Sequence, residues 1–128
     1  MARILLIDDD DGLRRVLRRA LQRRGYEVLE APDGREGLSL VGREQVDLVL
    51  TDMIMPGMEG VETIQQLRRT HPGLPIIAMS GGGRLKPEGY LQLAETFGAL
   101  SVLRKPFEND QLFATIEAVL NTKLGPHT

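Results

Sequence analysis

The sequence predicts an α/β protein in which a doubly wound, parallel sheet of five strands carries about five helices on its two faces. Short runs rich in isoleucine, leucine and valine alternate with longer stretches of helical period, which is the pattern of βα units in a parallel sheet covered on both sides. Glycine and proline clusters separate many of these elements and indicate turns. With 128 residues, the chain is long enough for one compact domain.

The expected strands are five short apolar runs. In chain order they are Ile4–Ile7, Glu27–Ala31, Leu48–Thr51, Ile76–Met79 and Leu100–Leu103. The second run is the weakest, and a Pro32-Asp33-Gly34 turn closes it, because proline fixes φ and glycine allows a tight reversal. Polar or charged residues follow the other four runs, namely Asp8 and Asp9, Asp52, Ser80, and Arg104 and Lys105.

The expected helices follow the strands. Their approximate bounds are Gly12–Arg24, Arg35–Gly42, Val61–Thr70, Tyr90–Phe97 and Asp110–Asn121. In the first helix Gly25 is placed to end the element, and in the last Asn109 is the expected N-cap. The apolar face of the first helix comprises Leu13, Val16, Leu17, Ala20 and Leu21. Its arginines are expected to be solvated or to face an acidic partner, and they are Arg14, Arg15, Arg18, Arg19, Arg23 and Arg24.

Composition limits the classes of partner and chemistry. A net charge of −2 gives no strong attraction to nucleic acid or to an anionic membrane. The absence of cysteine excludes disulfides and thiolate chemistry, and no apolar stretch approaches the ~20 residues that span a bilayer. We therefore expect one domain over residues 1–122, a tail over 123–128, and a cytoplasmic location without direct membrane or nucleic-acid partners.

Carboxylates, one hydroxyl and one ammonium are expected to converge at one edge of the sheet. In the flavodoxin-like strand order 2-1-3-4-5, strands one and three are neighbours, so Asp8 and Asp9 lie beside Asp52. Each like-charged pair at ~4 Å costs on the order of 4 kcal/mol at an effective dielectric near 20. Lys105 supplies one compensating positive charge, and Mg²⁺ is the natural candidate for the remaining positive charge. A carboxylate nucleophile beside cations suits phosphoryl transfer to an acyl phosphate on Asp52.

These motifs resemble the receiver domains of two-component response regulators. The resemblance covers about residues 3 to 121. The fragments that carry it are Leu-Leu-Ile-Asp8-Asp9-Asp10, Asp52-Met-Ile-Met-Pro56-Gly-Met-Glu-Gly60, Ala78-Met-Ser80, and Gly98-Ala99 leading to Lys105-Pro106-Phe107. Each fragment alone is common, but the ordered set at these spacings is highly specific.

The resemblance implies a role for each residue. Asp52 is the implied phosphoacceptor, and Asp8, Asp9, Asp52 and the backbone carbonyl of Ile54 are the implied Mg²⁺ ligands. Ser80 is implied to hydrogen-bond the phosphoryl group and Lys105 to pair with it, with a cis Lys105-Pro106 peptide. The implied donor is a phosphohistidine on a sensor histidine kinase or a histidine phosphotransfer protein, and the output is a change of affinity for a downstream protein.

Several positions depart from the family pattern. The site that is often an aromatic switch residue is Val102 here, and the connection from Ser80 to Gly98 is longer and richer in glycine than usual. The family places polar side chains that orient the hydrolytic water two residues after the phosphoacceptor and two after the Ser/Thr. Those positions are Ile54 and Gly82 in this chain. We therefore expect slow autodephosphorylation and no enzymatic activity beyond self-catalysed phosphotransfer.

Two other functions fit parts of the sequence. Asp8-Asp9-Asp10 could be the Asp-x-Asp of a haloacid-dehalogenase-like phosphatase with Asp8 as nucleophile, although that fold normally needs more chain and further acidic residues near its end. The chain could also be a docking module that transfers no phosphate. Labelling of Asp8 would support the phosphatase, labelling of Asp52 the receiver, and failure to bind Mg²⁺ the docking module.

Overall fold

The structure, a computed structural model, describes residues 2–53, 59–80, 99 and 101–124. The strands of this part are β1 (Arg3–Ile7), β2 (Glu27–Ala31), β3 (Leu48–Asp52), β4 (Ile76–Ser80) and β5 (Ser101–Arg104). Its helices are α1 (Asp11–Arg23), α2 (Gly34–Arg43), α3 (Glu59–Thr70) and α5 (Asn109–Leu124). The helix expected at Tyr90–Phe97 lies outside the described residues, and α5 continues two residues into the expected tail.

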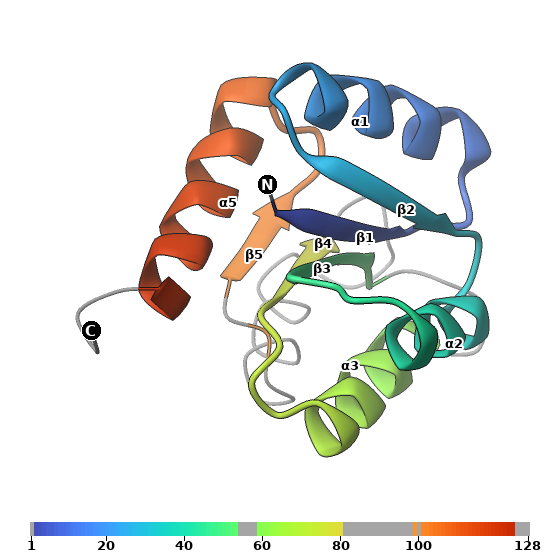
Figure 1. Cartoon of the computed structure of the whole chain (residues 1–128). Coiled ribbons are helices and arrows are strands. Elements are labelled where there is room, and N and C mark those ends of the chain that lie inside the picture. Colours follow the sequence, from blue (N-terminus) through green and yellow to red (C-terminus); the bar gives the residue numbers. More distant parts are fainter. Residues whose placement is uncertain (1, 54–58, 81–98, 100, 125–128) are drawn as a thin grey trace.

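All five strands are parallel, and their order is β2-β1-β3-β4-β5, which confirms the predicted topology (Figure 1). At the carboxyl ends, Ile7 of β1 lies beside Ala31 of β2 and Thr51 of β3. One step further along the sheet, Asp52 lies beside Met79 of β4. The segments that follow β1, β3 and β5 therefore leave the sheet along one edge.

Helices cover both faces of the sheet, with α1 and α5 on one side and α2 and α3 on the other (Figure 1). Successive side chains of a strand point to opposite faces, so β1 contributes to both hydrophobic cores. Leu5 and Ile7 belong to the core beneath α2 and α3. Ile4 and Leu6 belong to the core beneath α1 and α5. All four side chains are fully buried, and each such burial is worth roughly 1.5–3 kcal/mol.

Acidic N-caps begin two of the helices. The carboxylate of Asp10 accepts the backbone N–H of Leu13 at 3.0 Å, and that of Asp33 accepts the N–H of Glu36 at 2.9 Å. These bonds satisfy donors that a helix leaves unpaired in its first turn. After α1, Gly25 takes a φ of 99°, a conformation that favours glycine, so its expected role as a helix stop is confirmed.

The predicted N-cap of the last helix is wrong by one residue. We expected Asn109 to cap the helix, but α5 begins at Asn109 itself. The reason is that the N–H of Leu112 donates to the carbonyl of Glu108 at 3.1 Å, so Glu108 supplies the first acceptor.

Two details of α1 also differ from expectation. Val16 was expected on the buried face, but 61% of the residue is exposed. Arg14 and Arg18 were expected to be solvated or to face an acidic partner, but both form ion pairs within the chain, with Glu30 near the end of β2. Three other arginines of the helix are exposed as predicted, and they are Arg15, Arg19 and Arg23. The solvated face of α1 is therefore narrower than its sequence indicates.

Candidate functional site

Three carboxylates meet at the carboxyl edge of the sheet. Asp8 and Asp9 follow β1, and Asp52 ends the neighbouring strand β3. One oxygen from each carboxylate can be chosen so that all three lie within 4.8 Å of one another. Asp8 is fully buried, Asp52 is 5% exposed and Asp9 is exposed. The predicted convergence of these three side chains is confirmed.

Lys105 reaches this cluster from the segment after β5. Its Nζ lies 3.1 Å from Oδ2 of Asp8, to which it donates a hydrogen bond, and 3.4 Å from Oδ2 of Asp52. The Lys105-Pro106 peptide bond is cis, as the sequence resemblance implied. One ammonium thus faces two buried carboxylates, and the cluster as a whole keeps an excess of negative charge.

Asp8 is held in place by its own hydrogen bonds. Its Oδ1 accepts the backbone N–H of Asp10 at 2.9 Å, while Oδ2 accepts Lys105. Its backbone N–H donates to the carbonyl of Ala31 at 3.2 Å. A buried carboxylate is tolerated where its oxygens are hydrogen-bonded and its charge is paired, and both conditions hold here.

The donor set fits a hard divalent cation. Mg²⁺ takes oxygen ligands at about 2.0–2.1 Å in octahedral geometry, so that opposite ligands lie about 4.2 Å apart. Three carboxylate oxygens within 4.8 Å need only small shifts to share such an ion, with the exposed side of Asp9 open to water. A soft or thiolate-binding metal fits poorly, because the cluster offers oxygen donors alone.

An arginine network that the sequence interpretation missed supports the cluster from α1. Arg14 donates from Nη1 to the backbone carbonyl of Asp8 at 2.6 Å, from Nε to Glu30 at 3.2 Å and from Nη2 to Asp11 at 2.6 Å. Burial lowers the pKa of Arg14, but hydrogen bonds and charge attraction from Asp11 and Glu30 outweigh burial, so its pKa lies above the ordinary value. Helical spacing alone does not show that Arg14 faces β2.

Two further predicted site residues lie partly or wholly outside the part of the chain that the structure describes. The backbone of Ser80 ends β4 beside Arg104 of β5, whereas its side chain and the whole of Ile54 lie outside the described residues. Val102 is half-buried and packs against the core beneath α2 and α3. The roles expected of Ser80 and Ile54 therefore stay predictions.

An apolar groove lies beside Lys105, between α1 and the start of α5. Its volume is about 430 Å³, and it is lined by Leu13, Val16, Leu17, Lys105, Pro106, Phe107 and Asn109. The exposed Val16 side chain forms part of its wall. This groove was not predicted, because it needs residues that are about 90 positions apart in the sequence.

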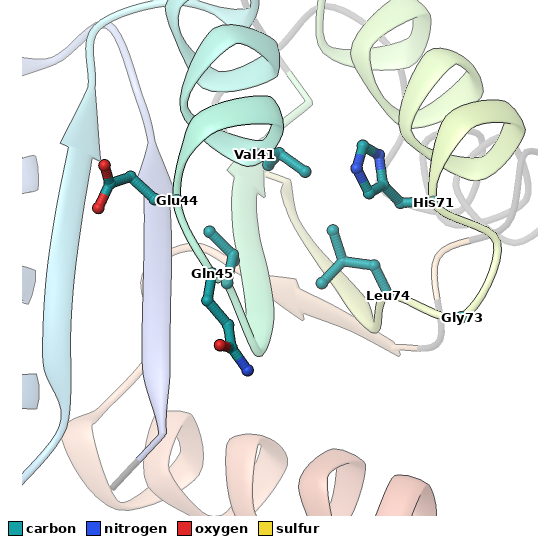
Figure 2. A pocket seen from close by; sticks show the side chains of 7 residues that line it. Val41, Glu44, Gln45, His71, Gly73 and Leu74 are labelled. Carbon is teal, nitrogen blue, oxygen red and sulfur yellow. The ribbon is translucent and has the colours of Figure 1, made fainter.

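A second hollow, of about 350 Å³, lies at the opposite edge of the sheet between α2 and α3 (Figure 2). Val41, His71 and Leu74 surround it. Leu74 precedes β4, so this hollow lies at the amino ends of the strands. His71 follows α3 directly and is therefore remote from the carboxylates.

Comparison with known proteins supports this description. A family model described as the response regulator receiver domain matches residues 4–117. The transcriptional regulatory protein GlrR of Escherichia coli (strain K12) is 36% identical over 93% of this chain, which spans only 26% of that protein. The sporulation initiation phosphotransferase F of Bacillus subtilis (strain 168) is 32% identical over 94% of this chain and 95% of its own length.

Solved structures of receiver domains have the same fold as this chain. A CheY-like response regulator receiver domain protein from Methanospirillum hungatei JF-1 superposes with a TM-score of 0.87 at 29% identity, over 96% of both chains. The chemotaxis protein CheY4 of Vibrio cholerae gives a TM-score of 0.83 at 33% identity, over 93% of this chain and 98% of the other. None of the helices in the described residues is long and apolar enough to cross a bilayer. Since the family model matches residues 4–117, the chain belongs to the response regulator receiver domain family.

Proposed function

We propose that Asp52 accepts a phosphoryl group from a phosphohistidine in a Mg²⁺-dependent reaction. The observation that supports this most directly is the convergence of Asp8, Asp9 and Asp52 with Lys105 at one edge of the sheet. Receiver domains generally bind Mg²⁺ at an acidic pocket and interact with histidine kinases or phosphotransfer proteins. Asp8, Asp9, Asp52 and the carbonyl of Ile54 would hold the ion here, and when bound it supplies positive charge to the phosphoryl oxygens.

In the proposed transfer, a carboxylate oxygen of Asp52 attacks the phosphorus atom. A P–O bond forms as the P–N bond to the donor imidazole breaks, and the electron pair of that bond leaves with the imidazole nitrogen. The ammonium of Lys105 lies within reach of Asp52 and is placed to pair with the new phosphoryl charge. The hydroxyl of Ser80 is proposed to donate a hydrogen bond to the same group.

Asp8 is poorly placed to act as a nucleophile. Both of its carboxylate oxygens accept hydrogen bonds, and the residue is fully buried. A phosphatase with Asp8 as nucleophile is therefore not favoured. The convergence of all four charged groups likewise argues against a docking module without phosphotransfer.

Treatment with acetyl phosphate and Mg²⁺ tests this proposal directly. We expect phosphate on Asp52 by mass-spectrometric mapping after trapping of the acyl phosphate. The modification should be lost when EDTA removes Mg²⁺, and also in the Asp52→Asn variant, which lacks the phosphoacceptor. Modification of Asp8 in the unaltered protein would instead support the phosphatase, and no modification together with no Mg²⁺ binding would support the docking module.

We also propose that the acyl phosphate decays slowly, because Ile54 offers no polar group to orient the attacking water. Ile54→Asn is expected to speed the decay by about 10-fold through improved positioning of that water. The measurement is the loss of phosphate after removal of the donor. Ile54→Leu is the matched control and should decay like the unaltered protein; equal rates for Asn and Leu at this position would contradict the explanation.

The phosphodonor protein is proposed to place a helix in the apolar groove beside Lys105. The groove opens next to the site and exposes Val16, while Arg19 and Arg23 are exposed on the same helix and suit an acidic flank. Val16→Asp is expected to slow transfer from a phosphorylated partner by at least about 10-fold. Labelling by acetyl phosphate should stay unchanged, because that donor needs no docking surface.

Gln22→Asp is the control for the groove, since it adds the same charge to an exposed position of α1 outside the groove lining. Comparable slowing by both variants would indicate a general charge effect. Slower labelling of Val16→Asp by acetyl phosphate would indicate damage to the site itself.

A further inference from the structure

We propose that Arg14 is a positioning residue that fixes the peptide between Asp8 and Asp9 and thereby aims Asp9 at the cation. This inference rests on the Mg²⁺ site proposed above. The guanidinium Nη1 donates to the carbonyl oxygen of Asp8 at 2.6 Å. That carbonyl belongs to the peptide plane that connects Asp8 to Asp9, so the hydrogen bond restrains the backbone from which the Asp9 side chain projects.

The guanidinium itself is held rigidly. Its Nε donates to Oε1 of Glu30 at 3.2 Å, and its Nη2 donates to Asp11 at 2.6 Å. Oε2 of the same Glu30 accepts a hydrogen bond from Arg18 at 2.6 Å. The Arg14 side chain is only 14% exposed. A planar donor group fixed by two carboxylates can hold a third acceptor in one place.

Asp9 needs such support more than its neighbour does. The Asp8 carboxylate has its own partners in the N–H of Asp10 and the ammonium of Lys105. The exposed Asp9 carboxylate has no hydrogen-bond partner among the described residues. Its direction is therefore set by the backbone, and the part of that backbone nearest to it is the peptide that Arg14 holds.

A positioning role for Arg14 predicts a change in Mg²⁺ affinity opposite in sign to the change that charge alone would cause. Arg14 is a positive charge close to a cation site, so its removal should strengthen Mg²⁺ binding if charge alone mattered. If Arg14 positions Asp9, its removal should weaken binding instead. Loss of a partner that orients a metal ligand typically costs 10–100-fold in metal affinity.

The test compares Arg14→Met with Arg18→Met. Both variants lose one positive charge and one hydrogen bond to Glu30, but only Arg14 reaches the Asp8 carbonyl. Mg²⁺ affinity is measured by titration calorimetry without a phosphodonor. We expect affinity to fall about 10-fold for Arg14→Met and to be unchanged or higher for Arg18→Met. An unchanged or higher affinity for Arg14→Met would overturn the inference.

Three further measurements separate positioning from folding. Arg14→Lys keeps the charge and one donor, so it should bind Mg²⁺ with an affinity between those of the unaltered protein and Arg14→Met. In phosphorylation assays Arg14→Met should need more Mg²⁺ for half-maximal rate while keeping the maximal rate at saturating Mg²⁺. A lower unfolding temperature with unchanged Mg²⁺ affinity in both Arg14 variants would leave Arg14 a purely structural role.

Failure of the inference differs from failure of the proposed function. If the unaltered protein binds no Mg²⁺ and is not modified at Asp52, the proposed function is wrong. If the unaltered protein does both and the Arg14 variants bind Mg²⁺ equally well, only the role of Arg14 is wrong.

Discussion

Gly60→Ala is expected to lower the free energy of unfolding by about 3 kcal/mol, the upper end of the usual cost of overpacking. A Cβ at Gly60 would lie 2.6 Å from the carbonyl oxygen of Asp52 and 2.7 Å from that of Met53. Both are backbone atoms at the end of β3, so neither can rotate away. Gly60 therefore allows the start of α3 to lie directly against the strand that carries Asp52, and urea denaturation with linear extrapolation measures the loss.

Gly42→Ala is the matched control, because Gly42 also lies in a helix but a Cβ there meets nothing within 4 Å. Alanine is the better helix former by roughly 1 kcal/mol, so this variant should be neutral or more stable than the unaltered protein. A stabilised Gly60→Ala variant would show that α3 can move away from β3 without cost. That outcome would contradict the close contact between α3 and the end of the strand.

Lys105→Met is expected to destabilise the metal-free fold by about 3 kcal/mol, because removal of one partner leaves a buried charge without compensation. The ammonium of Lys105 contacts both Asp8 and Asp52, and Asp8 is fully buried. Denaturation in EDTA measures the loss. Saturating Mg²⁺ should recover part of the stability, because an ion that binds only the folded state stabilises it.

Asp52→Asn is the control, and its expected effect on stability has the opposite sign. It removes one negative charge from the same cluster, so the midpoint of unfolding in EDTA should rise. An unchanged midpoint for Lys105→Met, or a lower midpoint for Asp52→Asn, would mean that repulsion among these carboxylates does not limit stability. The pairing of Asp8 with Lys105 can be isolated by repeating Lys105→Met in an Asp8→Asn background, where its cost should be smaller.

Much of the fold and of the charged cluster was predictable because the responsible signals are local. Each strand is a short apolar run, and parallel strands necessarily bring the residues that follow them to one edge. Asp8, Asp9, Asp52 and Lys105 all come at or just after such ends, so their meeting follows from strand order alone.

The features that the sequence did not predict depend on packing between distant segments. Arg14 and Arg18 are charged and follow the helical period of the outer face, yet both reach the end of β2 and pair with Glu30. Helical period gives the angle of a side chain around its own helix but not which neighbour it meets. Val16 is exposed for a related reason, because it lines the groove between α1 and the start of α5.

The placement of β1 has a consequence for how the domain moves. This strand has a hydrogen-bonded neighbour on each side and a hydrophobic layer above and below. Its amides can exchange with deuterated solvent only when the sheet separates, a process that requires nearly the whole free energy of unfolding. The acidic pair after β1 is thus attached to a strand that is held on all four sides, and we expect larger motions in segments with fewer neighbours.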